Sequence, residues 1–433
     1  LEDSMATLRA TREETLEQLR QTGQAGEGDQ EIWIPVLTRE DDLEETVSDE
    51  LEALEAAKNH IESQGLFFSE RTINAFHTSL KIAEMSPLVV LAGISGTGKS
   101  ELPRRYAEAM GMHFLPMPVQ PRWDSPQDLF GFYNYLEGRF RPTELTRALV
   151  QMDNYYDVEG RGWNMPDSWE HSLNDQVLLV LLDEMNLARV EYYFSEFLSK
   201  LETRRGIDID DTIAREKAEI SLEVGRQNRD AAIMRIFVRT NVLFVGTMNE
   251  DESTRTLSDK VVDRANVLRF GRPSRLRSRD VTDQDGEQEG KRSVLPFQTW
   301  LDWSQYSTSL ADRDVSDLVD GWIGRLNDAM AKIGRPFAHR AHQSMRSYLA
   351  NYPLQDDEGL KWAMADQIEQ RILPKFRGLD PMDQSVRSSL EIVMKLISEL
   401  EDDPLKASID AARNAQHSHQ FNWQGVDRAA EAH

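Results

Sequence analysis

The sequence of 433 residues contains no cysteine. Disulfide bonds, zinc sites built from thiolates and thiol nucleophiles are therefore excluded. No apolar run approaches the ~20 residues that a membrane-spanning helix needs. No basic segment followed by an apolar one opens the chain, so nothing argues for export. We expect a cytoplasmic protein without a membrane partner.

Positive charge is also scarce, with 50 Lys and Arg residues against 75 Asp and Glu residues and a formal net charge of −25. A surface this acidic repels phosphate backbones on average, so any contact with nucleic acid needs a local basic lining. Hydrophobic residues make up 39% of the chain, which is enough to form buried cores. The length favours about two to three domains.

The first 80 residues are polar, with helical patterns near residues 11–23 and 48–65. In the second pattern Ser48 is the expected N-cap and Gly65 the expected stop. The apolar face of this helix should hold Leu51, Leu54 and Ile61. We interpret residues 1–80 as an N-terminal helical arm or as the end of a preceding domain.

Residues 81–271 alternate apolar runs with helical patterns. The runs LVVLAG, QVLLVLLDE and NVLFVGTMN are typical of strands buried on both faces, as in a parallel sheet covered by helices. The alternation predicts an α/β core. Residues 272–299 are charged and lack periodicity, which predicts a linker, and residues 300–433 predict a helical domain with a C-terminal tail.

The sequence GISGTGKS follows the first apolar run and precedes a helical pattern that ends at Gly111. It fits the phosphate-binding pattern G-x-x-x-x-G-K-[ST] in its required strand–loop–helix context. Backbone N–H groups of such a loop bind phosphate oxygens at a helix N-terminus. The predicted nucleotide-binding residues are Gly93, Ile94, Ser95, Gly96, Thr97, Gly98, Lys99 and Ser100. Lys99 would bind the β and γ phosphates, and Ser100 would be a Mg²⁺ ligand.

Polar residues end the next two apolar runs. Asp183 and Glu184 follow six apolar residues, and the carboxyl edge of such a sheet is where ligands bind. Asp183 would hold Mg²⁺, and Glu184 would polarise the attacking water. Asn249 ends the third run and is either a turn residue or the amide that orients this water. Arg264 is either a solvated partner of Asp263 or an arginine finger.

The motifs GISGTGKS, LLVLLDEMN, FVGTMNEDEST and DRANVLRF, in this order, resemble those of AAA+ ATPases. The segments at residues 119–149 and 183–202, and RILPKFRG at 371–378, resemble the McrB-like branch of NTPase motors from modification-dependent restriction systems. The resemblance covers residues 81 to about 380. It implies a P-loop NTPase fold with a parallel sheet flanked by helices and an all-helical lid.

The resemblance also implies roles and partners. Asn249 would be the first sensor, Arg264 would act on the nucleotide of a neighbouring subunit, and Arg340 is a candidate second sensor, a role that Arg335 or Arg346 could also fill. A finger that acts in trans implies a ring, usually a hexamer. The cofactors would be Mg²⁺ and ATP or GTP. The segment MNEDEST at residues 248–254 does not decide between the two nucleotides, and we favour ATP.

Three functions compete. The first is a motor that moves or remodels DNA together with a separate nuclease in defence against foreign DNA. The second is a protein remodeller of the MoxR-like type, since the fold does not fix the substrate. Tyr133, Tyr135, Arg139 and Arg141 form a candidate substrate-facing segment that suits either polymer. The third is a nucleotide-gated scaffold, which intact Glu184 and Asn249 disfavour.

Overall fold

The computed structural model describes residues 30–39, 44–45, 48–153, 172–209, 211–227, 230–250, 257–272, 293–304, 310, 313–414 and 420–428. The helix expected near residues 11–23 lies outside this part of the chain. So do residues 273–292 of the expected linker and residues 251–254 of the segment considered for nucleotide choice. None of the helices in the described part combines the length and the apolar character that crossing a bilayer requires.

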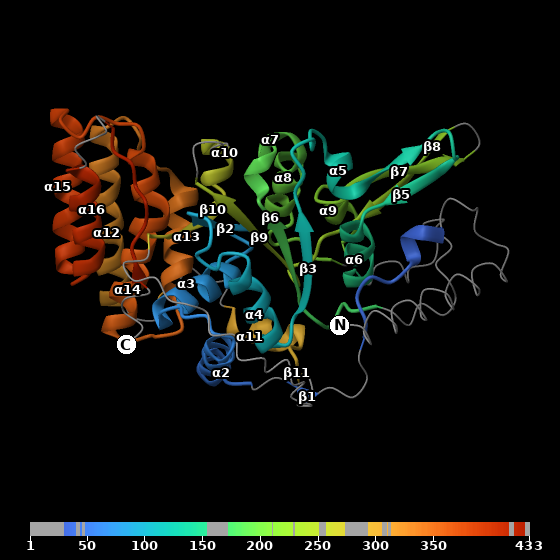
Figure 1. Cartoon of the computed structure of the whole chain (residues 1–433), viewed down its shortest axis with the longest axis horizontal. Helices are drawn as coiled ribbons and strands as arrows, with labels where there is room; N and C mark the ends of the chain where they lie inside the picture. The colour runs from blue at the N-terminus through green and yellow to red at the C-terminus, as the bar shows by residue number, and fades with distance from the viewer. Residues whose placement is uncertain are drawn as a thin grey trace.

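A five-stranded parallel sheet forms the centre of the molecule, with the strand order β10-β2-β9-β6-β3 (Figure 1). Its strands are β2 (Leu88–Gly93), β3 (His113–Pro118), β6 (Leu178–Asp183), β9 (Val242–Asn249) and β10 (Ala265–Phe270). All six residues of β2 are buried, as expected for a strand covered on both faces. The predicted α/β fold with a parallel sheet is confirmed.

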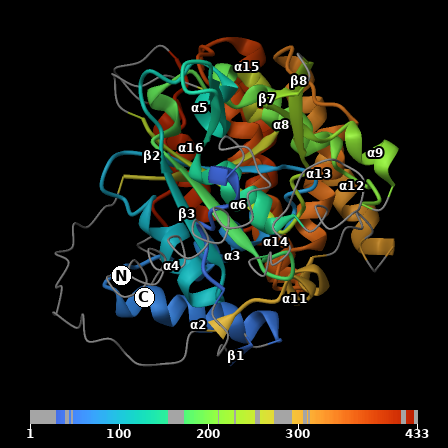
Figure 2. The same cartoon turned by 90° about the vertical axis from the view of Figure 1, so that its right-hand side faces the viewer.

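Successive residues of each strand enter different cores. Val89 and Leu91 of β2 face one helical layer, whereas Leu88 and Val90 face the other. The first layer comprises α2 (Glu50–Ser63), α3 (Glu70–Lys81), α4 (Glu101–Met110) and α11 (Phe297–Trp303). The second comprises α6 (Glu144–Met152), α7 (Val190–Tyr193) and α8 (Ser195–Thr203). In Figure 2, α2 lies below α4 at the edge of the molecule.

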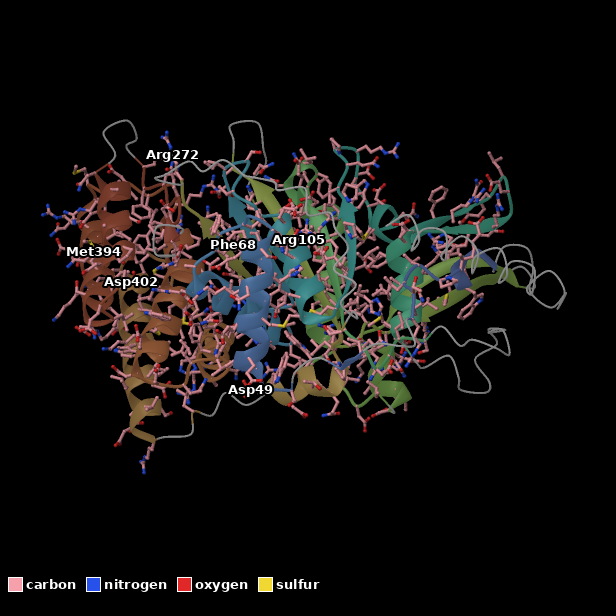
Figure 3. The ribbon with its side chains drawn as sticks, turned by 60° about the horizontal axis from the view of Figure 1, so that its bottom comes forward. Asp49, Phe68, Arg105, Arg272, Met394 and Asp402 are labelled. Atoms are coloured by element: carbon pink, nitrogen blue, oxygen red, sulfur yellow. The ribbon has the colours of Figure 1, made fainter. Side chains whose placement is uncertain are left out.

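The helices α2 and α3 form part of this first layer. Ala53, Leu54, Ala57 and Ile61 are the buried residues of α2, and Leu51 is 48% exposed. Leu54 and Ile61 of the expected apolar face are thus buried and Leu51 is not, while Ala53 and Ala57 complete the buried face. The N-cap is Asp49, whose carboxylate accepts hydrogen bonds from two backbone N–H groups, and not the expected Ser48 (Figure 3).

Two antiparallel hairpins extend from the core on the side away from the C-terminal helices (Figure 1). One joins β4 (Gly131–Asn134) to β5 (Arg139–Pro142), and the other joins β7 (Ile220–Gln227) to β8 (Asp230–Ile236). Several short elements lie between the main helices and strands of the core. They are η1 (Gln30–Trp33), α5 (Pro126–Phe130), η3 (Met185–Leu187), α9 (Thr212–Glu216), α10 (Asp259–Val262) and the paired strands β1 (Glu44–Glu45) and β11 (Ser293–Val294).

The C-terminal region is a helical domain with a core of its own. It contains α12 (Arg313–Lys332), α13 (His339–Ala350), α14 (Asp357–Gln367), η4 (Ile368–Ile372), η5 (Leu373–Phe376), α15 (Gln384–Glu399) and α16 (Asp403–Arg413). The predicted helical lid is confirmed, and it lies at one end of the molecule in Figure 1. The segment η4 contacts β10, so the lid covers this edge strand of the sheet.

Phe197 of α8 packs against the sheet. The ring of Phe197 is 2% exposed, and its centroid lies 5.1, 5.3 and 5.1 Å from those of Phe130, Phe194 and Phe244. We expect Phe197→Ala to lower the free energy of unfolding by about 3–5 kcal/mol, because the change leaves a cavity. Urea unfolding followed by circular dichroism measures this change.

The control is Tyr192→Ala, which removes a ring that is 51% exposed in the same short segment. It should change the unfolding free energy by no more than about 0.5 kcal/mol. Equal losses in the two variants would show that the cluster around Phe197 is not a packed core.

Candidate active site

The loop between β2 and α4 has the backbone shape that its glycines permit. Gly93 and Gly98 have φ angles of 146° and 84°, values that residues with a Cβ rarely adopt. A Cβ on Gly93 would lie 2.6 Å from the backbone oxygen of Phe270, and one on Gly98 would lie 2.9 Å from Cζ of Phe68. The loop is thus held between the end of β10 and the residue that precedes the N-cap of α3.

Lys99 is the cation of this loop and is only 5% exposed. Its Nζ donates a hydrogen bond to the backbone oxygen of Ile94. Burial lowers the pKa of Lys99, while the carboxylates of Glu250, Asp183 and Glu184 act in the opposite direction. The ammonium group is therefore held inside the loop by a neutral oxygen, which a phosphate oxygen can replace.

Asp183 lies at the end of β6, opposite Ser100 at the start of α4. Its Oδ1 accepts hydrogen bonds from Ser100 Oγ at 2.7 Å and from Thr247 Oγ1 at 2.6 Å. Side-chain oxygens are the ligands that Mg²⁺ prefers, so the Ser100–Asp183 pair fits the predicted metal site. The Thr247 hydroxyl fixes the carboxylate from the neighbouring strand β9.

Glu184 follows directly in the left-handed conformation, with φ 52° and ψ 45°. This backbone shape costs roughly 1–2 kcal/mol for a residue other than glycine, and such strain concentrates at functional sites. Two contacts hold it: the Glu184 N–H donates to Thr247 Oγ1 at 2.8 Å, and Asn249 Nδ2 donates to Glu184 Oε1 at 3.3 Å. The structure therefore brings Glu184 and Asn249 together at the same edge as Asp183.

The turn after Glu184 packs against strand β9. A Cβ on Gly246 would lie 2.1 Å from Met185 Sδ, so only glycine at this point of β9 leaves room for Met185. Asn186 Nδ2 donates to the backbone oxygen of Asn249 at 2.8 Å. The backbone positions of Glu184 and Asn249 are thereby linked.

Arg264 and Arg340 lie together near the amino ends of the parallel strands, whereas the phosphate loop, Asp183 and Asn249 lie at their carboxyl ends. Both bind Glu202: Arg264 Nε is 3.3 Å from Oε2, and Arg340 Nη1 is 2.7 Å from Oε1. Arg264 precedes β10, whose first residue pairs with Leu88 and whose last pairs with Gly93. At ~3.3 Å per strand residue, about 17 Å separates this end of the strands from the loop. That distance exceeds the reach of an arginine side chain.

The expected second sensor Arg340 therefore does not join the phosphate loop of its own chain in this structure. The two other candidates lie within or beside the lid. Arg335 donates to the backbone oxygen of Lys375, and Arg346 Nη1 is 2.6 Å from Asp320 Oδ1. No arginine among the described candidates thus reaches the loop of the same chain.

The sequence interpretation missed Thr247, Asn186 and Phe68. Thr247 and Asn186 contact the backbone or carboxylates of the predicted site residues, and Phe68 lies against Gly98. A hydroxyl within the buried run VLFVGTMN was the available signal for Thr247, because a buried hydroxyl requires a hydrogen-bond partner. No comparable signal marked Phe68.

Solved structures similar to the chain share little of its sequence. No curated protein matches the chain. A candidate ATPase from Cytophaga hutchinsonii is 15% identical, with a TM-score of 0.44 over 80% of this chain and 95% of its own. An MCM homolog from Methanopyrus kandleri is 11% identical, with a TM-score of 0.39 over 76% of this chain and 63% of its own.

Two family models match separate parts of the chain. Residues 288–420 match a domain of unknown function (DUF8727), which covers most of the helical lid. Residues 88–265 match the AAA domain of the dynein-related subfamily. This second match begins at the first residue of β2 and ends at the first residue of β10, so it contains the loop, Asp183, Glu184 and Asn249. Residues 88–265 are therefore similar to an AAA domain, and the helical lid follows them in the chain.

Proposed function

We propose that the chain is a Mg²⁺-dependent ATPase that works as a ring, with ATP favoured over GTP as the nucleotide. One observation carries the hydrolytic assignment: Ser100, Asp183, Thr247, Glu184 and Asn249 form a continuous chain of hydrogen bonds beside the phosphate loop. Phosphoryl transfer to water requires positioned groups and charge neutralisation more than covalent chemistry. The network provides such positioning.

Each residue has a distinct role in this proposal. The loop amides and Lys99 bind the phosphates. Ser100 and Asp183 would hold Mg²⁺, which when bound neutralises charge on the β and γ phosphates. Glu184 accepts a hydrogen bond from the attacking water and polarises it, and Asn249 orients the Glu184 carboxylate and this water.

Two substitutions separate binding from hydrolysis. Lys99→Ala should weaken nucleotide binding and lower kcat/KM by about 100-fold or more, because the buried cation is lost. Glu184→Gln should keep the nucleotide Kd and lower kcat by about 100-fold or more, because the amide is no base. Isothermal titration calorimetry with Mg-ATP and a phosphate-release assay measure the two effects.

Glu108→Gln on α4 is the matched control for removing a carboxylate, since within the described part of the chain the ion pairs of Glu108 are with His60 and Arg105. It should behave as the unsubstituted chain. Full hydrolysis by Glu184→Gln would remove the proposed role of Glu184.

The arginines support the ring. Arg264 and Arg340 share the carboxylate of Glu202 at the strand ends away from the phosphate loop. A triphosphatase site can receive an arginine from a neighbouring chain, and this arginine then stabilises transition-state charge. We infer that both arginines act on the nucleotide of the next subunit, with Glu202 holding them in position, and that six subunits close the ring.

Mixing two inactive variants tests this arrangement. Arg264→Ala retains its own phosphate loop, and Lys99→Ala retains its own Arg264. A mixture should hydrolyse ATP well above the sum of the two separate variants, because some interfaces then combine an intact loop with an intact arginine. Light scattering with a slowly hydrolysed ATP analogue should show the ring. A monomer at every concentration, or no recovery on mixing, contradicts action in trans.

The polymer on which the ring acts is a separate question. The resemblance to the McrB-like branch supports translocation or remodelling of DNA with a partner nuclease in defence. The β4–β5 hairpin favours a second candidate, a protein remodeller. Arg139 and Arg141 both pair with Glu31 and Glu137, so their charges are compensated. Tyr135 and Leu136 are 64% and 99% exposed at the tip.

Stimulated hydrolysis distinguishes the two candidates. For the DNA motor, we expect single-stranded or duplex DNA to raise the ATPase rate several-fold, with an effect that falls steeply with salt. For the remodeller, an unfolded protein such as reduced casein raises the rate and DNA does not. Leu136→Asp should abolish stimulation by the polymer that the hairpin grips.

Ile213→Asp, at a position 73% exposed in α9, is the matched control for placing a charge on an exposed apolar position. It should keep the stimulation. Stimulation by neither polymer would contradict both candidates and favour the nucleotide-gated scaffold.

A further inference from the structure

The C-terminal segment of residues 420–428, here called the strap, returns from α16 across the lid. Phe421, Trp423 and Val426 are at most 4% exposed and belong to the lid core. The Phe421 N–H donates to the backbone oxygen of Leu379 at 2.7 Å, and the Gly378 N–H donates to the oxygen of Phe421 at 3.1 Å. The strap is thus bound to the end of the RILPKFRG segment.

The same strap also contacts the end of β10. Val426 forms a parallel bridge with Phe270, and the Gly271 N–H donates to the backbone oxygen of Val426 at 3.2 Å. The strap and β10 lie side by side with their backbones in close contact. Gly425 has a φ of 86°, and a Cβ on it would lie 2.7 Å from the backbone oxygen of Arg269. This short distance leaves room only for glycine at position 425.

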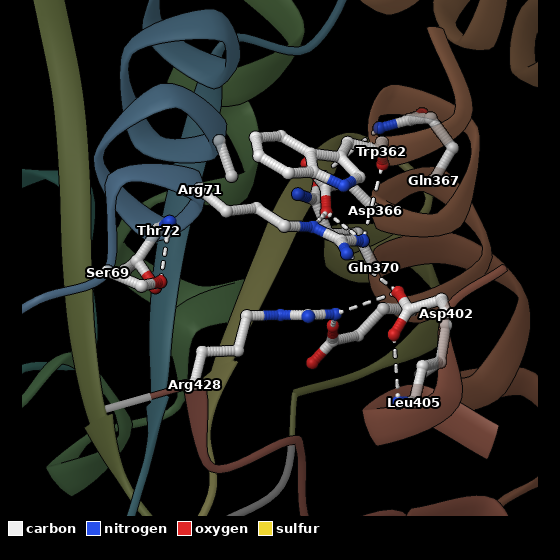
Figure 4. Close-up of polar contacts among 12 residues, drawn as sticks. Ser69, Arg71, Thr72, Trp362, Asp366, Gln367, Gln370, Asp402, Leu405 and Arg428 are labelled. Atoms are coloured by element: carbon white, nitrogen blue, oxygen red, sulfur yellow. Dashed lines mark hydrogen bonds and ion pairs between the residues drawn. The ribbon is translucent and has the colours of Figure 1, made fainter. Parts of the chain in front are cut away.

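The strap ends at Arg428 in a buried cluster of charges. Arg428 Nη2 lies 3.0 Å from Glu369 Oε2 and 3.4 Å from Asp402 Oδ2. Arg71 of α3 binds the same Asp402 oxygen at 2.7 Å and Asp366 at 2.8 Å. Figure 4 shows Arg71 reaching from α3 toward these carboxylates of the lid. All five side chains are at most 9% exposed.

The charges in this cluster stabilise one another. Burial opposes ionisation of Asp402, but Arg71 and Arg428 outweigh it and lower its pKa. Burial raises the pKa of Glu369 despite Arg428. Removal of Arg428 would take the ion pair from buried Glu369, and removal of Arg71 would take it from buried Asp366, and either loss is strongly unfavourable. The cluster therefore holds α3, the lid and the strap in one arrangement.

This arrangement adjoins the phosphate loop. Arg71 is in the first turn of α3, three residues after Phe68, and the Phe68 ring lies against Gly98. The Phe68 and Phe270 rings meet edge to face with centroids 6.0 Å apart. Phe270 pairs with Gly93 in the sheet. Both aromatic residues that flank the loop are therefore attached to segments that the strap and its charge cluster hold.

We propose that the strap is a positioning element of the nucleotide site. Through Arg428 and Arg71 it holds Phe68, and through Val426 it holds Phe270, so that nucleotide binding and the position of the lid are coupled. Arg428 and Gly425 are its positioning residues. The proposal rests on the proposed nucleotide hydrolysis and adds the element that connects the loop to the lid.

Hydrogen exchange of the full chain, with and without Mg²⁺ and ATPγS, tests the coupling. The nucleotide should slow exchange in residues 88–100 and also in residues 265–272, 371–379 and 420–428. Protection of residues 88–100 without any change in the strap would overturn the proposal while leaving nucleotide binding intact. If no region is protected, the proposed function itself fails.

Arg428→Met removes the charge and keeps most of the volume. We expect it to weaken ATPγS binding by roughly tenfold, on the scale of one charged buried contact, and to confine nucleotide-induced protection to residues 88–100. Arg387→Met, at a position 60% exposed, is the matched control and should leave both unchanged. A lower Tm with an unchanged Kd and unchanged coupling would show a merely structural role and overturn the proposal.

Gly425→Ala tests the close contact between the strap and β10 independently of charge. It should weaken ATPγS binding in the same direction as Arg428→Met, because the new Cβ pushes the strap away from β10. Gly206→Ala, at a φ of 66° with open space around it, controls for backbone strain alone. If both alanine variants bind ATPγS as the unsubstituted chain does, the strap has no role in the site. Exchange of the unsubstituted chain remains decisive if Gly425→Ala does not fold.

Discussion

The hydroxyl of Thr247 is the contact on which the active site depends. It donates to Asp183 and accepts from the Glu184 N–H, so one atom orders two successive residues of the neighbouring strand. This is possible because the parallel register sets Leu182 opposite Gly246, which makes Asp183 the neighbour of Thr247. The register of β2 against β9 sets Gly93 opposite Asn249. Strand pairing therefore brings Gly93, Asp183, Thr247 and Asn249 to one edge of the sheet.

The sequence was sufficient where a local pattern and a chemical requirement coincide. Six apolar residues before Asp183 predicted a strand covered on both faces, and such a strand in a parallel sheet ends at the ligand-binding edge. The glycines of the loop predicted a backbone that only glycine permits, as found at Gly93 and Gly98. These features are local, so a single stretch of sequence is enough to recognise them.

Features that depend on distant partners were not recognisable. Ala53 and Ala57 are weakly hydrophobic, and only the packing of α2 against α4 and α3 makes them core residues. Arg340 carries no mark in its own segment of the position of Glu202, which lies 138 residues away in the sequence. The strap lacks periodicity because it follows the surfaces of two domains and forms no repeating element. Its anchors Phe421, Trp423, Gly425 and Arg428 become meaningful only when their partners are known.

The strap and the two arginines connect the lid to the core at two separate places. The lid carries Arg340, which shares Glu202 with Arg264 of the core, and the strap joins the same lid to the end of β10 beside the phosphate loop. The lid is therefore attached to the core at both ends of the parallel strands. A change at the loop that moves Phe270 must either strain the strap or move the lid, and moving the lid shifts Arg340 relative to Arg264. In a ring, this displacement would reach the nucleotide of the adjacent subunit, so hydrolysis in one subunit would influence the next.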